Sequence, residues 1–216
     1  MTSTPRDALL AAYAAGSLTP ALQALVAAHL HMRRDNRAFV DALDGEMGVL
    51  LAAAPETPCR HRDENLARIL KSKAPAAALQ QDDAIFPAPL RAFLGFDAKD
   101  VRWRFLLPGV KCHVIAREAS GAATLYKIRP GRKMPFHTHD GNETTLVLHG
   151  SFADSLGTYE AGDLAFADRQ INHRPVAGDE GDCLCFAVTD APLRLTGRIG
   201  RILESLQQRH RSEFDA

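Results

Sequence analysis

The sequence has no excess of charge of either sign, few cysteines and no long apolar run. Its 26 Lys and Arg balance its 26 Asp and Glu, so the formal net charge of the 216-residue chain is zero. Proteins that bind nucleic acid directly carry a basic surface, and this composition argues against that class. The four cysteines show no framework spacing, which is typical of a reduced intracellular protein rather than a disulfide-stapled secreted one.

The chain also lacks a membrane segment by sequence criteria. No stretch reaches the roughly 20 consecutive apolar residues that a spanning helix needs. Near the start, the apolar stretch 8–15 is short, and Asp7 stands where a signal peptide would carry positive charge. We therefore expect a cytoplasmic protein. Hydrophobic residues make up 46% of the chain, which is enough for a buried core.

Helix signals dominate the first third of the chain. Asp7 is a candidate cap for a helix that ends at Gly16, and Thr19-Pro20 is a cap followed by a first-turn proline. Two more helices are expected at 36–54 and 63–73, the second with only a narrow apolar edge. The helix at 36–54 has an apolar stripe, expected to be buried, formed by Phe39, Val40, Leu43, Met47, Leu50 and Leu51.

A change of pattern divides the chain. Residues 74–89 hold three prolines and no periodicity, which predicts a linker. From about residue 90, short apolar segments alternate with turn residues, as in a sandwich or small barrel. A last amphipathic helix is expected at 198–210. The prediction is an α+β multidomain protein, with a small helical bundle at 1–73, the linker, and a β domain with a C-terminal helix at 90–216.

The candidate metal ligands in the sequence lie close together, at His137, His139 and Glu143. Residues two apart in a strand face the same side, so both imidazoles can reach one ion, and Glu143 keeps the same parity. Imidazoles with one carboxylate suit a divalent metal, with zinc the first expectation and Fe(II), Mn(II) or Ni(II) as alternatives. A fourth ligand must come from a later strand, and His173 is the candidate.

These residues resemble the cupin motifs. The run from Gly131 through His137-x-His139 and Glu143 to Gly150 matches the first motif, while 161–163 followed by His173 resembles the second more loosely. The resemblance implies a double-sheet β-barrel with one metal inside, held by His137, His139, Glu143 and His173. Cupins without metal exist, and hydrogen bonds alone can satisfy buried histidines, but four intact ligand positions favour a metal.

Nearly the whole chain resembles the ChrR-type cupin anti-sigma factors. The likeness lies in the opening helix at 7–16, in the segment 28–30, and in the β segments at 101–104, 143–150 and 182–194. It implies that the helical domain sequesters an extracytoplasmic-function sigma factor. It also implies that the cupin domain is required for release under oxidative stress, in response to an oxidant or small-molecule signal.

One departure from that family concerns zinc in the helical domain. The family's motif there is His-x3-Cys-x2-Cys; here His29 is kept, but Arg33 and Asn36 occupy the cysteine positions. A guanidinium cannot bind zinc, and an amide is a poor ligand. We therefore predict no zinc in the N-terminal domain. The apolar stripes of its helices would then have to hold the domain together, and loss of zinc does not by itself remove the sigma-binding face.

Two alternative functions remain open. The first is a metal-dependent cupin oxygenase that acts on a small substrate, although no acid–base residue stands out beyond the ligands and no catalytic residue is predicted. The second is a protein that binds a small metabolite and no sigma factor. Cys183 and Cys185 could form a redox-sensitive pair near the metal; we favour small core residues on a central strand.

Overall fold

The computed structural model describes residues 4–56, 58–72, 85–118, 121–191 and 193–195. The expected C-terminal helix at 198–210 and most of the expected linker lie outside this part of the chain. The described helices are α1 (Pro5–Ala14), α2 (Pro20–Met32), α3 (Arg37–Ala53), α4 (Arg62–Lys71) and α5 (Ala88–Leu94), followed by the short 3-10 helix η1 (Ala98–Asp100).

The helices α1 and α2 each begin directly after a threonine that caps them. α1 is capped by Thr4, whose side chain accepts from the Asp7 amide while the Asp7 carboxylate accepts from the Thr4 amide. Asp7 therefore completes a capping box three residues into the helix, and its prediction as the cap was wrong. Thr19 caps α2 with Pro20 at the first helical position, as predicted.

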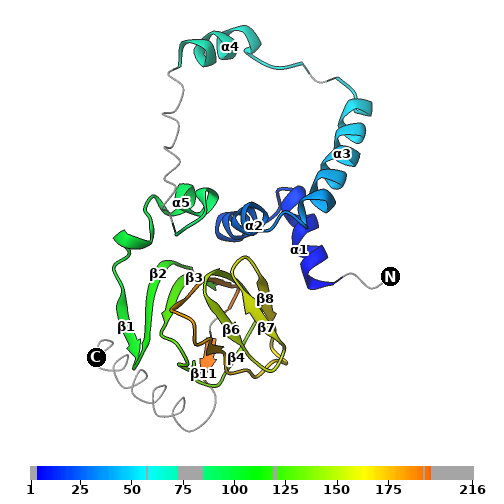
Figure 1. Cartoon of the computed structure of the whole chain (residues 1–216). Helices are drawn as coiled ribbons and strands as arrows, with labels where there is room; N and C mark the ends of the chain where they lie inside the picture. The colour runs from blue at the N-terminus through cyan, green and yellow to red at the C-terminus, as the bar shows by residue number, and fades with distance from the viewer. Residues whose placement is uncertain (1–3, 57, 73–84, 119–120, 192, 196–216) are drawn as a thin grey trace, which may run out of the picture.

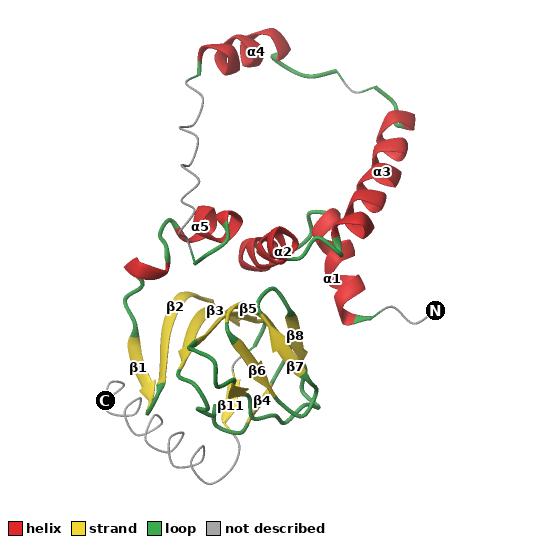
Figure 2. Ribbon diagram, viewed as in Figure 1, coloured by secondary structure: helices red, strands yellow, loops and turns green. Residues whose placement is uncertain are grey.

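Antiparallel strands form the expected two-layered barrel, which confirms the α+β fold class (Figure 2). One sheet has the order β1-β2-β3-β10-β5-β8, and the smaller ones have the orders β7-β6-β9 and β11-β4. The strands are β1 (Arg104–Leu107), β2 (Val110–Glu118), β3 (Gly121–Ile128), β4 (His137–His139), β5 (Glu143–His149), β6 (Ser151–Ala153), β7 (Thr158–Glu160), β8 (Leu164–Ala167), β9 (Val176–Ala177), β10 (Cys183–Thr189) and β11 (Leu193–Leu195).

The helices α1, α2 and α5 share a core with the large sheet. Leu25 and Val26 of α2 are fully buried in the same cluster as Leu125, Leu146 and Phe186 of β3, β5 and β10. A second cluster fills the barrel interior. Figure 1 shows these helices lying over one face of the large sheet. Helical and β parts are therefore joined by apolar packing as well as by the chain.

The helix α5 was missed by sequence analysis, which placed 74–89 in a linker. Phe86 and Leu90 are buried at 1% and 0% exposure, and Gly95, with a φ of 77°, ends the helix. The helical period was obscured by Pro87 at the N-cap, by Pro89 in the first turn and by the length of only 7 residues. The segment around α5 thus belongs to the core shared by α2 and the sheet.

The predicted burial of the apolar stripe on α3 was wrong. Of its residues only Val40 is buried. Leu50 and Leu51 are 67% and 77% exposed, and no residue of α4 is buried. Figure 1 shows α3 leading away from the barrel towards α4. None of the helices in the described segments is long and apolar enough to cross a bilayer.

Candidate functional site

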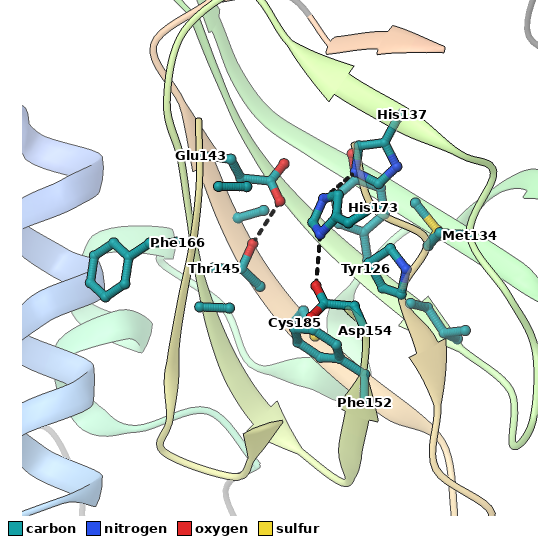
Figure 3. Close-up of a pocket in the computed structure, with 15 residues that line it drawn as sticks. Tyr126, Met134, His137, Glu143, Thr145, Phe152, Asp154, Phe166, His173 and Cys185 are labelled. Atoms are coloured by element: carbon teal, nitrogen blue, oxygen red, sulfur yellow. Dashed lines mark hydrogen bonds and ion pairs between the residues drawn. The ribbon is translucent and has the colours of Figure 1, made fainter. Parts of the chain in front are cut away.

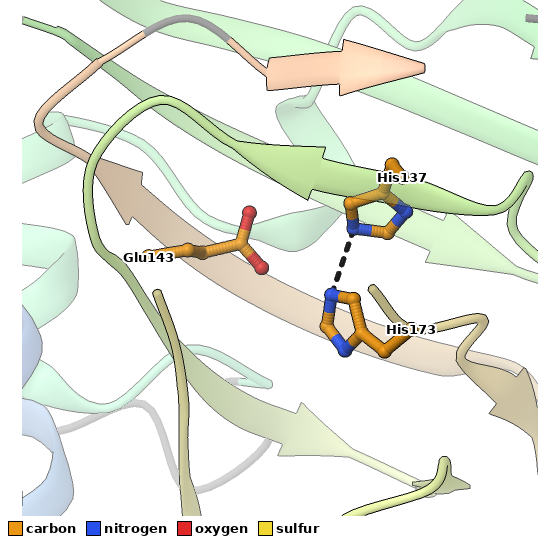
Figure 4. A group of neighbouring side chains, drawn as sticks. All are labelled: His137, Glu143 and His173. Carbon is orange, nitrogen blue, oxygen red and sulfur yellow. Dashed lines mark hydrogen bonds between the residues drawn. The ribbon is translucent and has the colours of Figure 1, made fainter. Parts of the chain in front are cut away.

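A strand-like contact brings two of the predicted ligands together. His137 begins β4, and His173 lies in the loop before β9; the two backbones form an isolated antiparallel bridge, with both N···O distances at 3.2 Å. Glu143 begins β5, on the other side of the turn from β4. Figure 4 shows the three side chains pointing towards a common point. One donor atom from each lies within 4.8 Å of the others.

The hydrogen bonds of the two imidazoles fix their tautomers. Nδ1 of His137 lies 2.9 Å from the Pro135 carbonyl oxygen, and Nδ1 of His173 lies 2.7 Å from Oδ2 of Asp154. A carbonyl and a carboxylate can only accept, so in the neutral rings both Nδ1 atoms carry the proton. The two Nε2 lone pairs then face each other across 2.9 Å. Two facing lone pairs repel, and a cation between them and Glu143 would remove that repulsion, so this donor set fits a divalent metal.

Asp154 supports the site from behind His173, and sequence analysis did not identify it. Its side chain is 1% exposed. Oδ1 accepts from the amides of Leu156 and Gly157 at 2.8 and 3.3 Å, while Oδ2 accepts from His173. A carboxylate in this position fixes the tautomer and the ring orientation of a metal-binding imidazole. The only signal in the sequence is a turn pattern, Asp154-x-x-Gly157, which carries no hint of a metal.

Replacing Asp154 by Asn is expected to lower zinc affinity by about 10- to 100-fold. Asn keeps the oxygen that accepts from the two turn amides, but it can place an N–H donor against His173 Nδ1 and disturb the tautomer. Competition titration with a zinc chelator measures the change. A matched Asp182→Asn variant, which loses only the surface pair with Lys127, should bind zinc as the native chain does. Equal affinity in all three proteins would contradict a supporting role for Asp154.

The remaining predicted ligand is His139. Its backbone ends β4 and pairs with Leu193 of β11, so it stands two residues from His137 on one strand, as expected. Its side chain lies outside the described part of the chain. The ligand set with His139 therefore stays a prediction, and the described geometry assembles His137, Glu143 and His173.

The donors open into a small apolar cavity of about 40 Å³ inside the barrel (Figure 3). Met134, Phe152 and Ala165 are among its walls, and Thr145 donates its hydroxyl to Glu143 at 3.1 Å. A water occupies about 10–15 Å³ on this measure, so the cavity has room for an ion with a water or a small ligand. Apolar walls exclude bulk water and strengthen electrostatic interactions at the donors.

Cys183 and Cys185 are buried free thiols with their sulfur atoms 3.5 Å apart. Both cysteines lie in the barrel core, as expected for small core residues on a central strand. Cys185 also lines the cavity. The hydrogen bond with Cys183, and then burial, raise the pKa of the Cys185 thiol well above its usual range. A thiol held protonated in this way is a poor nucleophile and a poor metal ligand.

A second candidate site is the exposed apolar surface of α3 and α4, named here the outer helix face. On α3 it comprises Met47, Val49, Leu50 and Leu51, and on α4 Leu66, Ile69 and Leu70, all between 47% and 77% exposed. Exposed apolar side chains gathered on a helix in this way are typical of protein–protein interaction sites. Figure 1 shows α3 and α4 apart from each other, so each helix offers its own apolar side chains.

Comparison with known proteins gives consistent matches. The family model described as the ChrR cupin-like domain matches residues 92–192. The anti-sigma-E factor ChrR of Cereibacter sphaeroides is 38% identical over 203 residues, which cover 92% of this chain and 94% of that protein. The crystal structure of Rhodobacter sphaeroides SigE in complex with the anti-sigma ChrR matches with a TM-score of 0.71 and 38% identity, covering 85% of this chain and 96% of that one.

Proposed function

The chain belongs to the ChrR family of anti-sigma factors, and we propose that it sequesters an extracytoplasmic-function sigma factor in the cytoplasm and releases it under oxidative stress. We assign sigma binding to the helical residues 1–73 and signal sensing to the cupin residues 90–216, joined by 74–89. The observation that carries the proposal is the outer helix face of α3 and α4, apolar and exposed, in a chain 38% identical to a protein solved in complex with SigE.

The outer helix face has the properties that a partner-binding surface needs. Leu50, Leu51 and Leu70 are each at least 67% exposed, so the isolated chain leaves a large apolar area in water. Burial of apolar area contributes about 25 cal/mol per Å², which makes association with a complementary apolar surface favourable. The chain's zero net charge lacks the excess of basic residues that is typical of proteins that bind DNA, and sequestration of a sigma factor needs no such excess.

The metal site provides the sensing element of the proposal. His137, His139, Glu143 and His173 would hold one divalent ion, with zinc the first expectation. When bound, the ion would tie β4, β5 and the loop before β9 into one unit. Asp154 holds the His173 ring in place, and Thr145 hydrogen-bonds the Glu143 carboxylate.

Release then needs only a difference in affinity between two states. An oxidant or small ligand that alters the ligand set would change the packing of the barrel, on which α2 lies through Leu25 and Val26. A coupling free energy of about 1–3 kcal/mol changes sigma affinity by 5- to 150-fold. That range is sufficient to shift a regulator between bound and free populations.

Co-expression of the full chain with each extracytoplasmic-function sigma factor of its source organism tests the proposal. We expect one of them to co-purify at one-to-one stoichiometry and to lose its transcriptional activity in vitro. If every such sigma factor fails to bind the metal-loaded chain, sequestration is wrong. In that event oxygen uptake with small oxidisable substrates would test the alternative of a metal-dependent oxygenase.

A further inference from the structure

The end of α2 contacts a single turn of the barrel through polar side chains. The turn connects β7 to β8 and contains Gly162, with a φ of 92°, and Asp163. A Cβ on Gly162 would lie only 2.8 Å from Cγ of Arg33, so any larger residue at 162 would push against the Arg33 side chain. The contact joins residues more than 120 positions apart in sequence.

His29 is the buried part of this contact. It is 3% exposed, and its Nδ1 lies 2.7 Å from the Gly162 carbonyl oxygen. A carbonyl only accepts, so Nδ1 is the donor and the neutral ring offers Nε2 as an acceptor. Nδ2 of Asn36 lies 2.8 Å from Nε2 and donates to it. Both nitrogens of His29 are thus used, one by the barrel and one by the segment that leads to α3.

Asn36 makes this bond instead of the one its position favours. It is the N-cap of α3, and Asn is among the best capping residues, yet its side chain makes no capping hydrogen bond. α3 therefore starts without a side-chain cap, while the amide binds His29. A local rule broken in this way, with the group used elsewhere, is typical of a functional position.

Arg33 and Asp163 complete the contact with an ion pair. Nη2 of Arg33 lies 2.9 Å from Oδ1 of Asp163, and Oδ2 of the same carboxylate accepts from the Glu160 amide at 2.8 Å. The carboxylate therefore closes its own turn and binds α2 at the same time. The backbone of the turn is bonded in both directions to Val147 of β5, through Gly162 and Asp163.

We propose that His29, Arg33, Asn36, Gly162 and Asp163, the joint cluster, fix the four-residue connection between α2 and α3 to the barrel and so set the direction of α3. α3 carries the outer helix face, and the turn leads into β8, whose Ala165 and Ala167 line the metal cavity. The cluster thus lies between the two sites. Its regulatory meaning rests on the proposed function, because α3 matters to sigma only if the outer helix face binds it.

Hydrogen exchange of the full chain tests the cluster directly. Replacing Arg33 by Asp, or Asp163 by Arg, should speed amide exchange over 33–40 by about tenfold, because the charged hydrogen bond that orders the connection is lost. Arg33→Lys, which keeps a positive charge next to the Asp163 carboxylate, should retain more of the slow exchange than Arg33→Asp does. The control is Lys127→Gln, which breaks a pair of similar exposure within the barrel and should leave 33–40 unchanged.

Asn36→Ala is a second variant for the same hydrogen-exchange experiment, and it leaves the turn between β7 and β8 unchanged. It removes the donor to His29 without touching Asp163, and we again expect faster exchange over 33–40. Unchanged exchange in Arg33→Asp and Asn36→Ala, or equally fast exchange in Arg33→Lys and Arg33→Asp, would overturn the joint cluster. The experiment contains no sigma factor, so it can fail while sequestration holds, and sequestration can fail while the cluster holds.

The cluster also predicts a pH dependence of stability. Burial lowers the pKa of His29, and nearby Arg6 lowers it further, against the opposing effects of the Gly162 carbonyl, Asp35 and Asp163. The folded chain thus binds fewer protons at His29 than the unfolded chain. Its contribution is present above the unfolded pKa of about 6.5 and is lost as the pH falls below it.

Thermal unfolding measures that dependence. Between about pH 7.5 and pH 5.5 the melting temperature of the native chain should fall by more than that of His29→Gln, in which this titration is absent. The two proteins differ only at residue 29, so effects common to both cancel in the comparison. An equal fall in the two proteins would contradict the buried neutral His29.

Discussion

Replacing both Leu50 and Leu51 on α3 by Glu is expected to weaken sigma binding by at least about 100-fold, with little change in the stability of the free chain. The two side chains are 67% and 77% exposed, so Glu there meets water in the unbound protein. In a complex it would place two carboxylates in an apolar interface. Loss of a central interface residue costs about 2 kcal/mol or more, and a buried unpaired charge adds to that.

The measurement is sigma affinity by calorimetry or by interferometry with immobilised sigma factor, together with thermal unfolding of each variant. Phe105→Glu is the matched control, because Phe105 is 73% exposed on β1, outside the outer helix face. It should bind sigma as the native chain does. If Leu50→Glu/Leu51→Glu binds normally, or if Phe105→Glu is the variant that fails, the outer helix face is not the contact surface.

The exposure of α3 explains where prediction from the sequence succeeded and failed. The helix itself follows from local pattern, and α3 begins and ends within one residue of the expected 36–54. Whether the apolar side chains of α3 are buried or exposed does not follow from the local sequence. An apolar stripe is the same in sequence whether it faces the protein's own core or a partner that is absent, and only Val40 turned out to be core.

The proposed metal site shows the same difference between what the sequence predicts and what only the fold reveals. His137, Glu143 and His173 could be named because parity on a strand and motif spacing are local properties. Asp154 could not, since its role depends on a contact with His173 across 19 positions that no spacing records. The joint cluster was hidden for the same reason. Asn36 has the sequence signature of a helix cap, and only the fold places His29 beside it.

Loss of a metal ligand is the second large effect expected. His173→Ala and Glu143→Gln should each reduce zinc affinity by more than about 100-fold, beyond what loss of a supporting residue causes. His173 is 5% exposed and holds Asp154, so its removal also disturbs packing. Glu143→Gln keeps the shape and the acceptor for Thr145, and it removes only the charge. The second variant therefore separates metal loss from misfolding.

Metal content by mass spectrometry and unfolding with and without a chelator measure this effect. We expect the chelator to lower the melting temperature of the native chain and to leave that of Glu143→Gln unchanged, since a ligand that binds only the folded state stabilises it. The control is His149→Ala, because His149 is an exposed histidine on the same β5 strand whose Nδ1 donates to the Asp182 carbonyl oxygen. Stoichiometric zinc in Glu143→Gln and His173→Ala alike would place any metal elsewhere in the chain. The barrel would then sense its signal without the three donors that the fold brings within 4.8 Å of one another.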